Sequence, residues 1–307
     1  MIEVRLASQL GYCSGVSQAI EQAIEYGDEP RTGMAYSLGT VAHNEHVVEL
    51  LRNHGVQPIS LDEMRDRSRV IITAHGAPPE IYERIEHQHC AFLDCTCPIV
   101  LKVQERVVEL ESHGYDVVIF GDPDHQEIKG LVGWARGKVK FVGDFNALFT
   151  LGQDHRSLGL GQRVGVVSQT TSVPEMYRDF IATLVGHHLD ESPEVRIFNT
   201  ICPIVATRVK DTRKLAGEVD MMFVVGSKES ANTRNLERVC RQTITQARAP
   251  WAVNLVQNED QVGKALSDWY VENDMSSPKV GVTAGTSTPI EVVEKVVAKL
   301  KYLGFAA

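Results

Sequence analysis

Six short apolar runs constrain the fold of this 307-residue chain more than any other feature. They are rich in valine and isoleucine and lack strict polar–apolar alternation. They cover residues 34–40, 69–76, 116–122, 163–171, 221–230 and 279–289. Such runs are typical of strands buried on both faces of a sheet. Amphipathic stretches lie between them, so the sequence predicts an α/β protein with mainly parallel sheets.

The segment CPIV occurs twice, at 97–100 and at 202–205. In both copies the cysteine stands at the expected N-cap of a helix. The proline stands at the first helical position, where its missing N–H costs nothing. A third cysteine, Cys13 in GYCSGV, also precedes an amphipathic stretch. We therefore expect three helices, each beginning at one cysteine.

Three cysteines at three helix N-termini indicate a particular chemistry. The partial positive charge of a helix N-terminus favours a thiolate. One thiolate could be a nucleophile, whereas three suggest a metal or cluster site on a pseudo-threefold axis. Three ligands on a four-iron cluster would leave one iron open to substrate, as catalytic zinc keeps one open position. The alternative is ordinary buried cysteine, and the compact spacing of ferredoxin ligands is absent.

A second, tighter group offers a rival metal site. It consists of His87, His89, Cys90 and Cys95, and its spacing matches no standard zinc finger. Cys90 and Cys95 are better explained as ordinary thiols beside a strand, and Cys240 as a core residue on a helix face. A zinc site is kept as an alternative.

Polar residues gather at the expected carboxyl ends of the strands, where parallel sheets bind ligands. Histidine can bind phosphate or transfer protons, and hydroxyl and amide groups beside helix N-termini bind anionic oxygens. A glutamate two residues after a histidine could pass protons. Each residue alone is also explained as a cap or turn former. Together they predict a polar, anion-binding pocket formed by His43, His75, His125, Glu127, Thr170, Ser230, Asn232 and Ser287.

Charge and motifs exclude several classes of protein. The net charge of −9 and a pI near 5.7 argue against a basic nucleic-acid surface. No secretory signal and no apolar run of membrane-spanning length are visible, so we expect a cytoplasmic protein whose cysteines are not structural disulfides. The phosphate-loop, serine-hydrolase and dinucleotide-binding glycine motifs are absent.

Nine motifs, in one order from GYCSGV to AGTSTP, resemble the LytB-type family of 4-hydroxy-3-methylbut-2-enyl diphosphate reductases. They are C-x-G-V at Cys13, A-H-N at His43, A-H-G at His75, T-C-P at Cys97, H-x-E at His125, Q-T-T at Thr170, I-C at Cys202, G-S-K-x-S-x-N around Ser230 and Asn232, and G-V-T-A-G-x-S at Ser287.

The resemblance implies a trefoil of three pseudo-threefold-related α/β units around a central [4Fe–4S] cluster with an open iron site. Cys13, Cys97 and Cys202 would hold the cluster. Glu127, helped by Thr170 and His125, would deliver the proton that lets an allylic hydroxyl leave as water. The products would be isopentenyl and dimethylallyl diphosphate, the last step of the non-mevalonate isoprenoid pathway. Ferredoxin or flavodoxin would supply electrons. The diphosphate would be held by His43, His75, His125, Thr170, Ser230, Asn232 and Ser287.

The chain departs from the family pattern at several positions. Ala231 stands where the family commonly has a second serine, and Gln126 replaces the usual proline between His125 and Glu127. The stretch before His125 reads GDPD, and the run after Cys202 also differs. These departures keep two alternatives open: a diverged homologue that reduces another allylic alcohol or diphosphate, and a non-catalytic anion-binding protein.

Spacing also suggests a division into three units. The first would cover residues 1–96, completed by residues 280–307. The second would cover 97–196 and the third 197–279.

Overall fold

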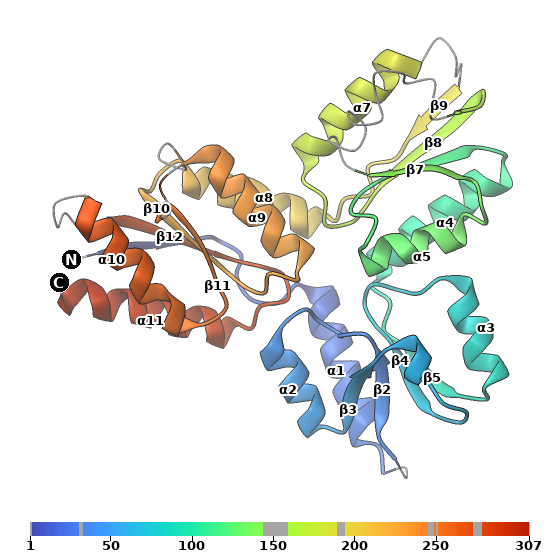
Figure 1. Cartoon of the computed structure of the whole chain (residues 1–307), viewed down its shortest axis with the longest axis horizontal. Coiled ribbons are helices and arrows are strands. Elements are labelled where there is room, and N and C mark those ends of the chain that lie inside the picture. Colours follow the sequence, from blue (N-terminus) through green and yellow to red (C-terminus); the bar gives the residue numbers. More distant parts are fainter. Residues whose placement is uncertain are drawn as a thin grey trace. The chain divides into compact units, whose positions relative to one another are not determined.

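The computed structural model of the chain describes residues 2–30, 33–143, 159–188, 194–244, 249, 251–272 and 278–306. Strands and helices alternate along it (Figure 1). The strands are β1 (Glu3–Leu6), β2 (Ala35–Leu38), β3 (Val56–Ile59), β4 (Arg69–Ile72), β5 (Ala91–Asp94), β6 (Asp116–Phe120), β7 (Val139–Gly143), β8 (Arg163–Ser168), β9 (Glu194–Ile197), β10 (Met221–Val225), β11 (Val253–Val256) and β12 (Lys279–Ala284).

The helices fill the connections between these strands. They are α1 (Ser14–Asp28), α2 (Glu45–Asn53), α3 (Pro79–His87), α4 (Pro98–Ser112), α5 (Gln126–Trp134), α7 (Pro174–His188), α8 (Pro203–Ala216), α9 (Ala231–Thr243), α10 (Val262–Glu272) and α11 (Ile290–Ala306). Among the described residues, no helix is long and apolar enough to cross a membrane.

The strands form three four-stranded sheets, and every strand pair in them is parallel. The orders are β3-β2-β4-β5, β7-β6-β8-β9 and β11-β10-β12-β1. The pattern is the same each time, except that the N-terminal strand supplies the last position of the third sheet. The predicted α/β class with parallel sheets is confirmed.

Two compact units divide the chain. The first comprises Met1–Ser17, Ala42–Glu49 and Pro203–Ala307, and contains the β1-β12-β10-β11 sheet. The second comprises Gln18–Val41 and Leu50–Cys202, and contains the other two sheets.

The strand pairing bears on the three-part division expected from the sequence. β12 lies between β1 and β10, so residues 280–284 share a sheet with both the start of the chain and the segment 197–279. β2 to β5 form a sheet without β1. The boundaries at residues 96 and 196 remain a prediction from spacing.

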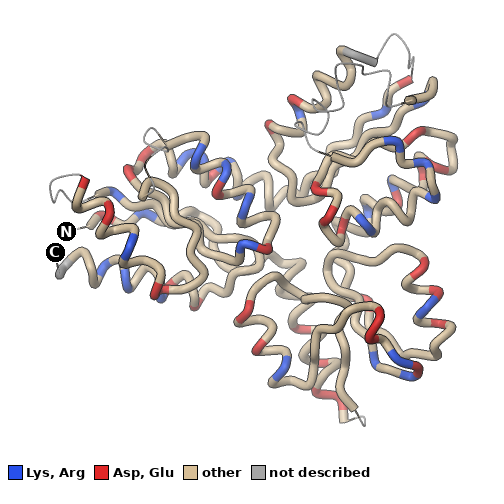
Figure 2. The backbone as a smooth tube through the Cα atoms, viewed as in Figure 1, with Lys and Arg blue, Asp and Glu red and all other residues tan. Residues whose placement is uncertain are grey.

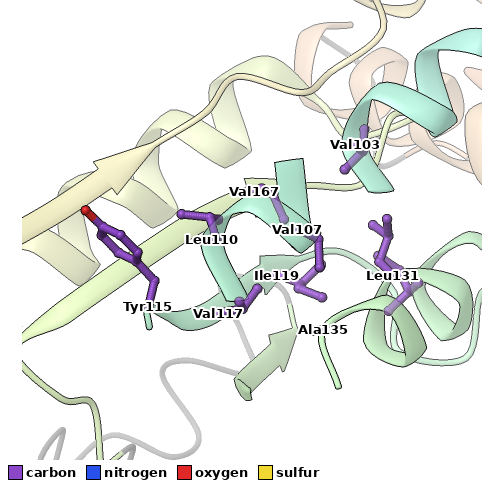
Figure 3. Packing of buried hydrophobic residues seen from close by; sticks show 10 residues of the cluster. Val103, Val107, Leu110, Tyr115, Val117, Ile119, Leu131, Ala135 and Val167 are labelled. Carbon is purple, nitrogen blue, oxygen red and sulfur yellow. The ribbon is translucent and has the colours of Figure 1, made fainter. Parts of the chain in front are cut away.

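A helix-to-sheet core in the second unit shows why these segments fold as they do (Figure 3). Val103, Val107 and Leu110 of α4 recur three and four positions apart, so they share one helical face. That face packs against Val117 and Ile119 of β6, and all five are at most 1% exposed. Apolar burial of this kind stabilises by roughly 1.5–3 kcal/mol for each large side chain.

The helices of the first unit cover both faces of its sheet. In Figure 1, α8 and α9 lie side by side along one face, and α10 and α11 lie along the other. Basic and acidic residues are interspersed along the described helices rather than separated into long single-sign runs (Figure 2). This layering brings the carboxyl ends of β10 and β12 to the N-termini of α9 and α11.

Candidate functional site

The three cysteine corners have the same backbone geometry. Each cysteine directly precedes a helix, α1, α4 or α8, and Cys97 is the N-cap of α4 with Pro98 in its first turn. Each cysteine N–H donates to the carbonyl oxygen of the residue two positions beyond the end of β12, β4 or β8. The pairs are Cys13 with Thr286 (3.1 Å), Cys97 with Ala74 (3.1 Å) and Cys202 with Thr170 (2.9 Å). The predicted helix starts are therefore confirmed.

The corner thiols differ from the core thiols in exposure. Cys13, Cys97 and Cys202 are half-buried. Cys95 and Cys240 are buried, and burial raises the pKa of each of these two thiols to about 12. Thiolates are the metal-binding form of cysteine. The donor chemistry therefore favours the three corners over Cys95 and Cys240 as ligands.

The alternative zinc group has little support within the described chain. His87 and His89 are exposed, and the thiol of Cys90 donates to the carbonyl of Arg65 (3.3 Å). Among the described residues, these four do not bring three metal-ligating atoms close together.

A buried carboxyl group lies in the second unit. Glu127, in the first turn of α5, is 2% exposed. Its Oε1 accepts the backbone N–H of Thr170 (2.7 Å) and its Oε2 accepts the Thr170 hydroxyl (2.8 Å). Burial raises the pKa of Glu127 to about 7, although both hydrogen bonds act in the opposite direction. Glu127 can therefore gain or lose a proton near neutral pH.

His125 lies beside this carboxyl group. It is the N-cap of α5, and its Nδ1 accepts the backbone N–H of Glu127 (3.2 Å). That bond requires an unprotonated Nδ1, so the ring proton is on Nε2. The His75 ring contacts the His125 ring edge-to-face at 5.3 Å between centroids. The second unit thus brings together His75, His125, Glu127 and Thr170.

The first unit holds the remaining predicted polar residues. Ser230 is the N-cap of α9, and its hydroxyl accepts the N–H of Thr233 (3.3 Å). Asn232 Oδ1 accepts the N–H of Thr286 (3.0 Å). Within the described residues, Asn232 Nδ2 and Ser287 Oγ are buried without a hydrogen-bond partner. Buried polar groups normally have partners, so these two atoms are available as hydrogen-bond donors to a ligand.

His43 belongs to the first unit and precedes α2. Burial lowers the pKa of His43, while Glu229 raises it and Arg234 lowers it. The neutral imidazole is therefore favoured at neutral pH. A neutral ring offers one N–H donor to an anion without an added charge.

Comparison with known proteins identifies the family. The family model described as LytB protein matches residues 4–301. The chain belongs to the LytB family.

Named relatives agree over the whole length. A 4-hydroxy-3-methylbut-2-enyl diphosphate reductase of Geotalea uraniireducens (strain Rf4) is 35% identical over 300 residues, covering 98% of this chain and 97% of the relative. The enzyme of the same name from Caldanaerobacter subterraneus subsp. tengcongensis is 32% identical over 305 residues, covering 98% of both chains.

Solved structures give the same result. One, described as (E)-4-hydroxy-3-methyl-but-2-enyl diphosphate reductase, the terminal enzyme of the non-mevalonate pathway, is 32% identical. It has a TM-score of 0.65 and covers 98% of this chain and 100% of its own. The reductase of Plasmodium falciparum, at 23% identity and a TM-score of 0.82, covers 97% of this chain and 87% of its own, and supports the fold.

This LytB chain departs from the expected motifs at Gln126 and Ala231, and the structure shows what surrounds each of them. Gln126 is exposed at the start of α5, and its Nε2 would lie 2.4 Å from a Cβ placed on Gly39. Both residues line a cavity of about 350 Å³ at the carboxyl ends of β2 and β4. Ala231, the first residue of α9, is buried beside Ser230. Gln126 therefore forms part of this cavity's wall, where the family pattern has proline.

The sequence patterns did not single out Thr286 and Arg208 of this LytB chain as candidate functional residues. Thr286 links Asn232 to Cys13, because its N–H donates to the amide and its carbonyl accepts from the cysteine. Arg208 is buried in α8, six residues after Cys202. Periodicity places Arg208 on a helix but does not show that a charged side chain is buried.

Proposed function

We propose that this chain is a 4-hydroxy-3-methylbut-2-enyl diphosphate reductase. The reaction removes the allylic hydroxyl with two electrons and two protons, forming water and isopentenyl or dimethylallyl diphosphate. The observation that carries the proposal is the recurrence of one cysteine corner at Cys13, Cys97 and Cys202. The match to reductases over nearly the whole chain supports it.

The donor set fits an iron–sulfur cluster. Three half-buried thiols at helix N-termini suit [4Fe–4S] ligation with one iron lacking a protein thiolate. When bound, such a cluster would supply electrons one at a time and an open iron site. Ferredoxin or flavodoxin is the proposed electron donor.

The diphosphate would be bound mainly by neutral groups. Histidine N–H, hydroxyl and amide donors can satisfy anionic oxygens. Ser230 and Asn232 lie at the N-terminus of α9, where the helix dipole is positive and attracts an anion. The unpartnered Asn232 Nδ2 and Ser287 Oγ support this assignment. The proposed binding residues are His43, His75, His125, Thr170, Ser230, Asn232 and Ser287.

Glu127 would be the proton donor. A carboxyl with a pKa of about 7 is partly protonated at neutral pH, as a general acid requires. The Thr170 hydroxyl holds the carboxyl, and the N-cap bond of His125 orients the imidazole so that Nε2–H is available. Proton delivery to the leaving hydroxyl oxygen would then make water the leaving group.

Thr170→Val should shift the pH profile of turnover. The variant loses the hydroxyl that donates to Glu127 Oε2 but keeps the backbone N–H bond. A hydrogen bond to a charged group is worth about 1.5–3 kcal/mol, so the pKa of Glu127 should rise by about one to two units. The alkaline limb of the profile should therefore move to higher pH. An unchanged limb would remove Thr170 from the control of Glu127.

Asn232→Asp should weaken diphosphate binding. The variant keeps the Oδ1 acceptor for Thr286 but replaces the unpartnered Nδ2 donor by an anionic oxygen. Loss of a charge-assisted hydrogen bond corresponds to roughly a 10–150-fold rise in KM. The matched control is Asn235→Asp, one turn further along α9, which should leave KM unchanged. Equal KM values in both variants would contradict the assignment of Asn232.

Two measurements test the function: the visible spectrum with the iron and sulfide content, and the turnover of the diphosphate compared with that of the alcohol. We expect oxygen-free purification to give a brown protein with about four irons and four sulfides per chain. It should prefer 4-hydroxy-3-methylbut-2-enyl diphosphate strongly over the non-phosphorylated alcohol. A brown protein without that preference would indicate a diverged homologue. A colourless protein that cannot be reconstituted would leave the anion-binding alternative.

A further inference from the structure

Arg208 is a buried charge in the middle of α8. Arg208 is 2% exposed, and its side chain is among the largest fully buried ones of the described residues. Burying a charge without a partner costs several kcal/mol. A buried arginine therefore normally has a carboxylate partner, as Arg69 has in Glu29 (3.1 Å).

The structure gives Arg208 only neutral acceptors. Its Nη1 donates to the carbonyl of Ala284 (2.8 Å) and to that of Gly11 (3.2 Å), and its Nη2 donates to Gly11 (3.1 Å). Its Nε is buried without a partner. Across the part of the chain that is described, no carboxylate pairs with this guanidinium. The fold therefore contains an uncompensated positive charge.

The two carbonyl acceptors of the Arg208 guanidinium belong to the chain segments beside Cys13, one of the candidate cluster ligands. Gly11 lies two residues before Cys13. Ala284 lies two residues before Thr286, whose carbonyl accepts the N–H of Cys13. Arg208 therefore links the two chain segments that hold this cysteine. Burial lowers the pKa of Arg208, and the charge of Cys13 acts in the opposite direction.

We propose that Arg208 is the internal counter-ion of the iron–sulfur cluster held in part by Cys13, and that its charge raises the cluster's reduction potential. The inference rests on the proposed function. Reduction adds one negative charge, which a buried cation nearby stabilises more strongly than it stabilises the oxidised state. Charge and hydrogen bonding around a cluster are the protein's main means of setting its potential.

The test is a redox titration of reconstituted protein, followed by electron paramagnetic resonance. Arg208→Gln removes the charge and should make the potential more negative by at least a tenfold change in the one-electron equilibrium, 59 mV. Arg208→Lys keeps the charge and should stay within half of that shift. The matched control is Lys210→Gln, an exposed cation on the same helix, which should leave the potential unchanged because water screens it.

The outcomes separate the counter-ion inference from a purely geometric effect and from a failure of the proposed function. An Arg208→Gln potential equal to that of the wild type would overturn the inference. Equal shifts in the Gln and Lys variants would also overturn it, because loop geometry rather than charge would then be responsible. A wild-type protein that binds no cluster would instead refute the proposed function.

A stability measurement covers the case in which Arg208→Gln cannot be titrated. Cluster binding stabilises the folded state, so reconstitution should raise Tm. The increase should be smaller in Arg208→Gln than in the wild type and in Lys210→Gln, because the counter-ion is missing. The same increase in all three proteins would contradict the inference.

Discussion

Cys97→Ser is expected to lose the cluster and, with it, all turnover. Cys97 is the N-cap of α4, and its N–H is fixed by the carbonyl of Ala74. Serine can keep the backbone geometry of an N-cap, so the fold should survive. A hydroxyl is a poor substitute for a thiolate on iron, because cluster sites select soft sulfur ligands. Iron and sulfide content and the visible spectrum measure the result.

The matched control is Cys90→Ser. Cys90 is also a half-buried thiol, and serine can replace it as a donor to the carbonyl of Arg65. This variant should bind iron and sulfide as the wild type does. A brown, active Cys97→Ser protein would remove Cys97 from the ligand set, and loss of iron in Cys90→Ser would make Cys90 a candidate iron ligand.

Glu127→Gln should lower turnover by about 10²–10⁴-fold while the cluster content stays unchanged. The amide has nearly the shape of the carboxyl group but cannot supply the proton. The variant still offers an oxygen to one Thr170 donor, so the local fold should be kept. The turnover rate on the diphosphate substrate measures the loss of activity, and the visible spectrum measures the cluster content.

The wild-type pH profile gives a second readout of the same residue. The acid form of Glu127 is present below its pKa of about 7 and is lost as pH rises through that value. Turnover should therefore fall on the alkaline side, and the residual activity of Glu127→Gln should lack this limb. The control is Glu105→Gln, an exposed residue of α4, which should keep both rate and profile. Normal turnover in Glu127→Gln would exclude it from proton delivery.

The central strands could be read from the sequence, whereas the edge strands could not. The six apolar runs became β2, β4, β6, β8, β10 and β12, the two inner strands of each sheet. Inner strands are covered on both faces, so their residues are nearly all apolar. Edge strands such as β5 and β9 are partly exposed and mix polar with apolar residues. Their composition does not distinguish them from loops.

The corner cysteines were also visible in the sequence. At Cys97 and Cys202, CPIV combines a cap position with proline at the first helical position, and Cys13 precedes an amphipathic stretch. Their common hydrogen bond was not visible. It joins Cys13 to Thr286, residues at opposite ends of the chain. That bond exists only because β1 pairs with β12. Parallel pairing over such a separation carries no local signal, since it depends on the closure of the whole sheet.

By itself, the sequence determined the α/β class, the inner strands, the helices that begin at the cysteines and the types of residue at the strand ends. Only the tertiary structure decided the charge states. Burial decides that Glu127 titrates near neutral pH and that Arg208 is a cation without a carboxylate partner among the described residues. Residue type sets the ordinary pKa, but the loss of water around a group and its nearest partners depend on segments far away in the chain.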